Sequence, residues 1–72
     1  MSYLGKWLED ERKRRGIENQ TDWAKVLHIS QPYYSQIVNG YEPVKKVMEI
    51  EKTLNLSPFT LVKKMRKSRT SA

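Results

Sequence analysis

The 72-residue chain contains no cysteine and only one histidine. Without cysteine, disulfide bonds and thiolate zinc sites are excluded, and a single histidine excludes a metal site built from several histidines. The absence of disulfides is compatible with a reducing compartment. We therefore expect a protein that holds no metal and no cofactor.

Long hydrophobic runs are also missing from the chain. No apolar stretch approaches the roughly 20 residues that a membrane-spanning helix needs, and the N-terminal segment MSYLGKWLEDER lacks the order of a signal peptide. Paired carboxylates, a nucleophile beside a base and a glycine-rich phosphate loop are absent too. We therefore expect a soluble, cytoplasmic protein that is not an enzyme, with no membrane partner and no small-molecule substrate.

The charge is strongly of one sign. Fourteen Lys and Arg residues oppose eight Asp and Glu residues, for a net charge of +6. The basic residues are clustered, in residues 12–15 and again in residues 63–69. A clustered positive charge favours a polyanionic partner, nucleic acid before anionic lipid, over the alternative of a merely basic surface.

Apolar spacing and capping residues predict five short helices, over residues 3–15, 20–27, 31–38, 44–54 and 58–66. Ser2, Asn19 and Ser30 are the expected N-caps, and a proline stands in the expected first turn of the third and fifth helices. Short helices with short loops predict a compact all-α domain over residues 1–66, followed by a basic flexible tail over residues 67–72.

The expected turns contain residues that accept a left-handed backbone, namely Gly16, His28 and Gly40, and Asn55 is expected to end the fourth helix. We expect His28 to be a turn residue and not a catalytic one. Glu51 falls on the inward stripe of the fourth helix and weakens it. The residues expected to face inward are Leu4, Trp7, Leu8, Trp23, Ala24, Leu27, Tyr34, Ile37, Val38, Val44, Val47, Met48, Leu54, Phe59, Val62 and Met65.

The segment over residues 19–40, NQTDWAKVLHISQPYYSQIVNG, places two of these helices on either side of a tight turn, as in a helix-turn-helix. It resembles the helix-turn-helix family of the phage Cro and CI repressors, whose approximate pattern is T-Q-x-x-L-A-x-x-L-G-[IV]-S-Q-x-x-[IV]-S-x-[IL]-x-N-G. The positions that match it, directly or by a similar residue, are Asn19, Gln20, Trp23, Ala24, Leu27, Ile29, Ser30, Gln31, Ser35, Ile37, Asn39 and Gly40.

The resemblance covers residues 3–66 and implies a five-helix lambda-repressor-like domain whose third helix binds DNA. Gln20 would contact a phosphate and brace Gln31, and Gln31 would read a base edge, since a glutamine amide can pair with adenine through two hydrogen bonds. The candidate DNA contacts are Gln20, Ser30, Gln31, Pro32, Tyr33, Ser35, Gln36, Asn39 and Tyr41. The candidate phosphate contacts are Arg12, Arg15, Lys45 and Lys46.

Two functions follow from the resemblance. The first is a small phage-type regulator that binds operator DNA, as a homodimer, and controls a lysogeny-type switch in the cytoplasm of a bacterial host. The second is an anti-repressor that uses the same fold to bind a partner repressor. Pro32 stands where a hydrogen-bonding residue is common, and Tyr33, Tyr34 and Tyr41 could supply a protein interface, so both functions stay open.

Overall fold

A computed structural model describes the backbone of residues 2–70 and the side chains of residues 2–65, and the described backbone forms five helices. Between residues 2 and 70 there is no strand, so the predicted all-α class is confirmed. The elements in chain order are α1 (Tyr3–Arg14), α2 (Gln20–Val26), α3 (Gln31–Val38), α4 (Val44–Thr53) and α5 (Thr60–Thr70).

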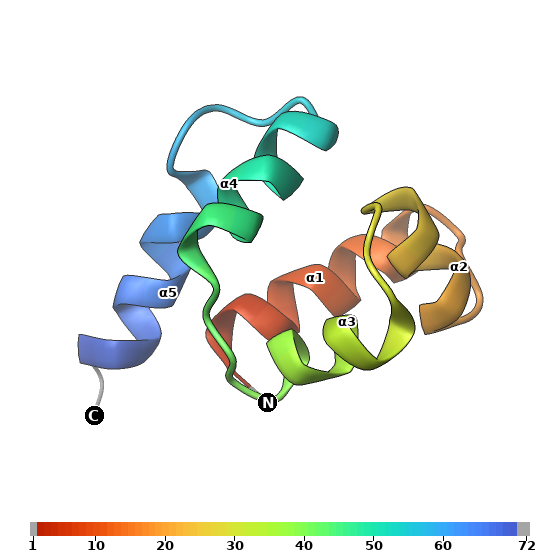
Figure 1. The fold of residues 1–72 in the computed structure, drawn as a ribbon, viewed down its shortest axis with the longest axis horizontal. Coiled ribbons are helices and arrows are strands. Elements are labelled where there is room, and N and C mark those ends of the chain that lie inside the picture. The colour runs from red at the N-terminus through yellow and green to blue at the C-terminus, as the bar shows by residue number, and fades with distance from the viewer. Residues whose placement is uncertain (1, 71–72) are drawn as a thin grey trace.

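Helix α1 lies at the centre of the arrangement (Figure 1), where it packs against both α3 and α5. Helix α2 packs on α3, and α4 packs on α5. The radius of gyration is 11.2 Å, close to the value of about 11 Å expected for a compact chain of this length. In the described part of the chain, no helix is long and apolar enough to cross a membrane.

The first three helices begin at the predicted capping residues. The Ser2 Oγ accepts a hydrogen bond from the Gly5 N–H at 2.9 Å. The Asn19 Oδ1 accepts one from the Asp22 N–H at 2.8 Å, and the Ser30 hydroxyl accepts one from the third residue of α3 at 3.2 Å. Each cap satisfies a backbone donor that the helix itself leaves unpaired, which confirms these three starts.

The predicted turn residues adopt the expected left-handed backbone. His28 has a φ of 62°, Gly16 of 74° and Gly40 of 117°. Asn55, predicted only to end the fourth helix, also has a positive φ, of 59°. Helices α1, α2 and α4 each end one residue earlier than predicted, because that residue forms the C-cap.

The predicted start of the fifth helix is wrong. Helix α5 begins at Thr60 and not at Pro58, because Phe59 has a φ of 67° and cannot belong to the helix. The Phe59 side chain, predicted to face inward, is 52% exposed. The same helix continues to Thr70, past the predicted end at residue 66; of the predicted flexible tail, residues 71–72 lie outside the described residues.

Glu51 explains why α5 begins where it does. Its side chain is buried, and its carboxylate accepts backbone N–H bonds from Phe59 at 3.2 Å, Leu61 at 2.7 Å and Val62 at 3.3 Å. A carboxylate on α4 therefore caps the N-terminus of α5, where the helix dipole favours negative charge. Glu51 therefore faces inward on α4 because its carboxylate is needed as the cap of α5.

The core is otherwise close to the predicted set, with two corrections on α4. Val44 and Met48 are exposed, and Ile50 is buried in their place, because the buried face of α4 is turned toward α5. The buried apolar residues are Leu4, Leu8, Trp23, Ala24, Leu27, Tyr34, Ile37, Val38, Val47, Ile50, Leu54, Leu61 and Met65.

A close crossing of α1 and α3 was not predicted. A Cβ atom added at Gly5 would lie 2.4 Å from the Val38 carbonyl oxygen, so only glycine fits this point. The Ser2 N–H donates to the same carbonyl at 3.2 Å. The start of α1 is thus joined to the end of α3 by backbone contact.

Candidate nucleic-acid interface

Four residues separate α2 from α3, and the buried faces of the two helices hold them together. Trp23 and Ala24 are buried on α2, Ile37 is buried on α3, and Leu27 is buried in the connection. The Ile29 N–H donates to the Ala24 carbonyl at 3.0 Å, which closes the turn after α2. Helix α3 is therefore held in one orientation by packing on α2 and α1.

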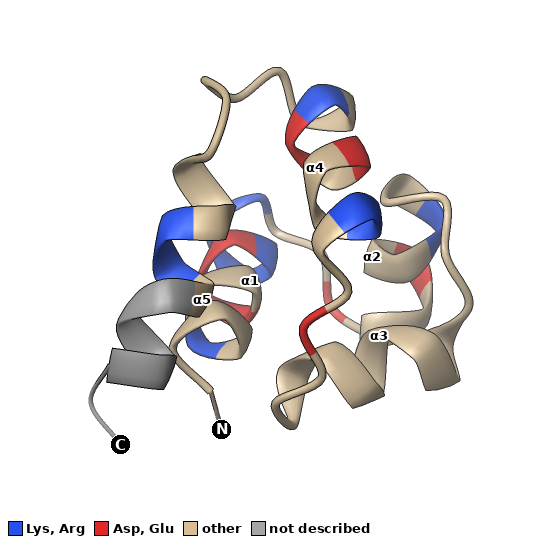
Figure 2. Ribbon diagram, turned by 60° about the vertical axis from the view of Figure 1, so that its left-hand side comes forward, with Lys and Arg blue, Asp and Glu red and all other residues tan. Residues whose placement is uncertain are grey.

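The outward side of α3 carries polar and aromatic side chains without charge. No Lys, Arg, Asp or Glu occurs in α3, which is coloured tan along its whole length in Figure 2. Pro32, Gln36 and Asn39 are exposed, and Gln31 and Ser35 are partly exposed. Without a carboxylate of its own, this helix presents nothing that would repel a phosphate backbone.

A hydrogen bond joins the first residues of α2 and α3. The Gln31 Nε2 donates to the Gln20 Oε1 at 3.3 Å. The contact that the family resemblance implied between these two side chains is therefore present. It holds the Gln31 amide at the exposed start of α3.

A buried carboxylate joins α1 to α3. The Glu9 Oε2 accepts a hydrogen bond from the Tyr34 hydroxyl at 2.6 Å, and the Arg12 guanidinium donates to both Glu9 oxygens at 3.3 and 3.1 Å. Burial raises the pKa of Glu9, but the hydrogen bonds from Arg12 and Tyr34 bring this pKa below its usual value. The carboxylate is therefore ionised at neutral pH.

Tyr34 cannot contact a partner protein, and that prediction is wrong. Its side chain is 0% exposed, and burial together with the hydrogen bond to Glu9 raises the pKa of its hydroxyl. Spacing had also placed Tyr34 inward, and this is confirmed. A buried tyrosine hydroxyl needs a hydrogen-bond partner. That requirement was the one signal in the sequence for an acceptor such as Glu9, which sequence reasoning missed.

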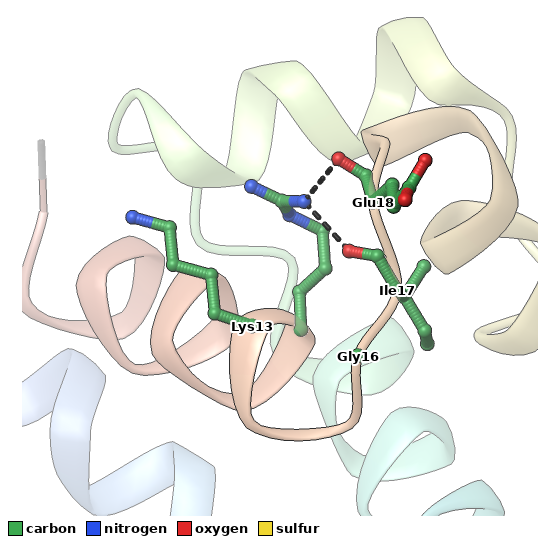
Figure 3. Close-up of a pocket in the computed structure, with 5 residues that line it drawn as sticks. Lys13, Gly16, Ile17 and Glu18 are labelled. Atoms are coloured by element: carbon green, nitrogen blue, oxygen red, sulfur yellow. Dashed lines mark hydrogen bonds between the residues drawn. The ribbon is translucent and has the colours of Figure 1, made fainter.

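The contacts of Arg12 also argue against its predicted role as a phosphate contact. Besides binding Glu9, its Nη1 donates to the carbonyl oxygens of Ile17 at 2.8 Å and Glu18 at 2.7 Å, the dashed lines of Figure 3. The side chain is only 12% exposed. A guanidinium has five N–H donors, and four are engaged here, so Arg12 fastens the loop after α1. The shallow recess of about 380 Å³ beside this loop is also lined by Lys13 and Gly16.

The other candidate phosphate contacts differ in how strongly they are engaged. Arg15 donates to Glu11 at 2.9 Å and lies over the Trp23 ring at 5.6 Å. Lys46 pairs with an α4 carboxylate, Glu49, at 3.7 Å, and Lys45 is exposed. Lys45 is thus the member of the set best placed for a new partner.

Two tyrosines pair at the edge of this surface. The rings of Tyr33 and Tyr41 are 5.8 Å apart and meet edge to face at 75°. Tyr41 is 50% exposed. Nearby, the Asn39 Nδ2 donates to the Ser35 carbonyl at 2.9 Å, and this bond fixes the end of α3. Tyr33, Asn39 and Tyr41 therefore belong to α3 and the short segment that directly follows it.

Comparison of the chain with protein-family models, with curated proteins and with solved structures finds no match. The geometry of this surface is therefore the basis on which a function can be proposed.

Proposed function

We propose that the protein is a small helix-turn-helix regulator of the Cro and CI type, with a lambda-repressor-like fold, that binds operator DNA through α3 and controls a lysogeny-type switch. The observation that carries the proposal is the Gln20–Gln31 hydrogen bond at the exposed start of an uncharged helix. It presents a prearranged amide at the end of a helix whose opposite face is buried.

A single helix such as α3 fits the major groove of B-form DNA, which is about 12 Å wide and admits one helix. Gln31 supplies a donor and an acceptor for a base edge, and Ser35 and Gln36 follow on the same helix. Gln20, Ser30 and Lys45 would contact phosphates and so position the helix, and the net charge of +6 would strengthen these contacts.

A domain of this size reads a short half-site, and specific affinity then requires two copies on a palindromic operator. We place the contact between copies around α5 and its neighbours. The bacterial cytoplasm is the compartment in which such a regulator would act.

The Tyr33–Tyr41 pair favours a second function, binding to a partner repressor as an anti-repressor. Tyrosines supply a large contact area at low entropic cost, and Tyr41 is half exposed. Pro32, beside Gln31, has no side-chain donor or acceptor for a base.

The two functions are separated by measuring binding to the DNA beside the protein's own gene, at several salt concentrations, with and without the neighbouring repressor. A DNA reader should show a steep salt dependence and should lose about tenfold in affinity for its preferred site when Gln31 is replaced by Ala. Thr53→Ala, at the last residue of α4, is the matched control and should leave affinity unchanged.

A protein that never distinguishes this DNA from random duplex, but alters the repressor's binding, would contradict the DNA-binding proposal and support the anti-repressor function. If no contact with the repressor is found, the anti-repressor function is wrong instead.

A further inference from the structure

A recess between α1 and α5 lies on a different face of α1 from the contacts with α3. Its volume is about 180 Å³, and its lining residues are Tyr3, Lys6, Trp7, Asp10 and Lys64. The four that belong to α1 recur at spacings of three, four and seven residues, which places them on one face of that helix. Gly5 and Glu9, which contact α3, lie on another face. Helix α1 therefore separates the recess from α3 (Figure 1).

Two aromatic side chains form the apolar part of the recess. Tyr3 is 48% exposed, and Trp7 is partly buried against the core. Tyrosine and tryptophan often anchor a partner in protein interfaces, because they supply a large contact area with few rotatable bonds. An apolar cavity of roughly 150 Å³ is large enough to bind benzene. The recess therefore has room for one apolar side chain of a partner.

Lys64 gives the recess an unbalanced positive charge. Its Nζ lies 5.5 Å from the centre of the Tyr3 ring, which is a cation–π contact, and its side chain is partly buried. Within residues 2–65, no carboxylate pairs with Lys64, and the Asp10 carboxylate is already paired with Lys6 at 3.5 Å. Helix α5 itself has no Asp or Glu in its sequence, TLVKKMRKSRT. The group that would balance Lys64 is therefore an anion from outside the domain.

A carboxylate on a peptide fits this arrangement better than a phosphate backbone does. Duplex DNA carries one negative charge per about 1.7 Å of its axis, so phosphates that approach Lys64 would also meet the Asp10 carboxylate. A peptide can place a single carboxylate at Lys64 and an apolar side chain beside Trp7. Its backbone N–H groups can then face Asp10, which only accepts hydrogen bonds when ionised.

We propose that the recess between α1 and α5 is a docking site for an acidic segment of a partner protein, which inserts an apolar side chain beside Trp7 and pairs a carboxylate with Lys64. A partner bound there would leave the outward side of α3 free for its own target. The inference goes beyond the proposed DNA-binding function and does not depend on it.

The probes are synthetic peptides in which one leucine, methionine or phenylalanine is flanked by glutamates, and matched peptides in which lysines replace the glutamates. Binding is followed by NMR titration of the two indole N–H signals, because Trp7 lines the recess and Trp23 is buried in the core. At least one acidic peptide should shift the Trp7 signal and leave the Trp23 signal unchanged. If no acidic peptide shifts Trp7, the proposal is wrong.

A charge exchange tests the role of Lys64. Lys64→Glu should weaken binding of the acidic peptide by about tenfold or more, because like charges then meet in the recess, and it should strengthen binding of the lysine peptide. A purely structural effect would weaken both peptides together. Lys52→Glu changes the net charge by the same amount at an exposed position on α4, outside the recess, and should alter binding by about twofold or less.

Tyr3→Ala tests the aromatic part of the recess. It removes the exposed ring and should weaken the acidic peptide by about tenfold, whereas Tyr3→Phe keeps the ring and should bind as the wild type does. Equal losses in Lys64→Glu and Lys52→Glu would mean that the peptide senses net charge alone, and this would overturn the proposal. The same conclusion follows if a single-stranded oligonucleotide or a vesicle of anionic lipid shifts the Trp7 signal at lower concentration than any acidic peptide, in a manner that Lys64→Glu abolishes.

Discussion

Glu9 on α1 and Glu51 on α4 are both buried carboxylates, but different groups satisfy them. Glu9 binds side chains, the Arg12 guanidinium and the Tyr34 hydroxyl. Glu51 binds backbone N–H groups at the start of α5. The same residue type therefore holds side chains of α1 and α3 in one half of the molecule and initiates a helix in the other.

The difference matters because a backbone N–H cannot move away when its partner is lost, whereas a side chain can find solvent. Removal of Glu51 should therefore damage the fold, and changes around Glu9 should act on the α1–α3 half.

The largest effect is expected for Glu51→Ala. It leaves the N–H groups at the start of α5 without their acceptor, and it should lower the free energy of unfolding by about 3 kcal/mol, measured by urea denaturation. Glu49→Ala on the same helix is the control, because Glu49 is exposed, and it should change stability by about 0.5 kcal/mol or less. Equal losses in the two variants would show that Glu51 is not the cap.

Gly5→Ala tests the α1–α3 half without altering Glu9. The added methyl group would meet the Val38 carbonyl, so α1 and α3 must separate, at a cost of about 2 kcal/mol in the free energy of unfolding. Gly16→Ala is a comparison in open space, where the cost comes from the left-handed backbone alone. A stable Gly5→Ala protein with unchanged amide spectra would contradict the close crossing.

Tyr34→Phe should destabilise the protein by about 2 kcal/mol at neutral pH, because it removes a hydrogen bond to a charged group. The pKa of Glu9 is lowered in the folded protein, so its contribution is present above the unfolded value of 4.5 and is lost as the pH falls through the lower folded value. The difference between Tyr34→Phe and wild type should therefore shrink on acidification to about pH 3, measured by urea denaturation at both pH values. A difference independent of pH would mean that the hydroxyl does not bind an ionised Glu9.

The smallest effect is expected for Glu11→Gln. Hydrogen bonds from Arg14 lower the pKa of Glu11, burial raises it, and Arg15 lowers it further. Its arginine partners are exposed, so water and salt weaken these pairs. Urea denaturation should show that Glu11→Gln lowers the free energy of unfolding at low salt and that this loss largely disappears at high salt. A salt-independent loss of stability as large as that of Tyr34→Phe would mean that Glu11, like Glu9, makes hydrogen bonds that solvent does not screen.

Local patterns were sufficient for the starts of α1, α2 and α3. Ser2, Asn19 and Ser30 each bond to a backbone N–H three residues onward, so the whole signal lies within one turn of chain. The positive φ at His28 was predictable for the same reason. The start of α5 was not, because its cap comes from Glu51, eight or more residues earlier in the chain.

The candidate site divides in the same way. The exposed polar residues of α3 follow from helical periodicity, and the Gln20–Gln31 contact followed from the family resemblance. The engagement of Arg12 by Glu9 and by the loop carbonyls could not be predicted, because it depends on how α1, α3 and the loop meet in space.

The amino-acid order alone settles the all-α class, the first three helix starts and the turn residues, since these depend on interactions within a few residues of chain. The tertiary structure decides the roles of the carboxylates and cations, because the role of a charged side chain depends on the groups that it contacts, and these groups come from other elements. It places Glu51 under the start of α5 and Glu9 against the Tyr34 hydroxyl, and it engages Arg12 with Glu9 and the loop after α1.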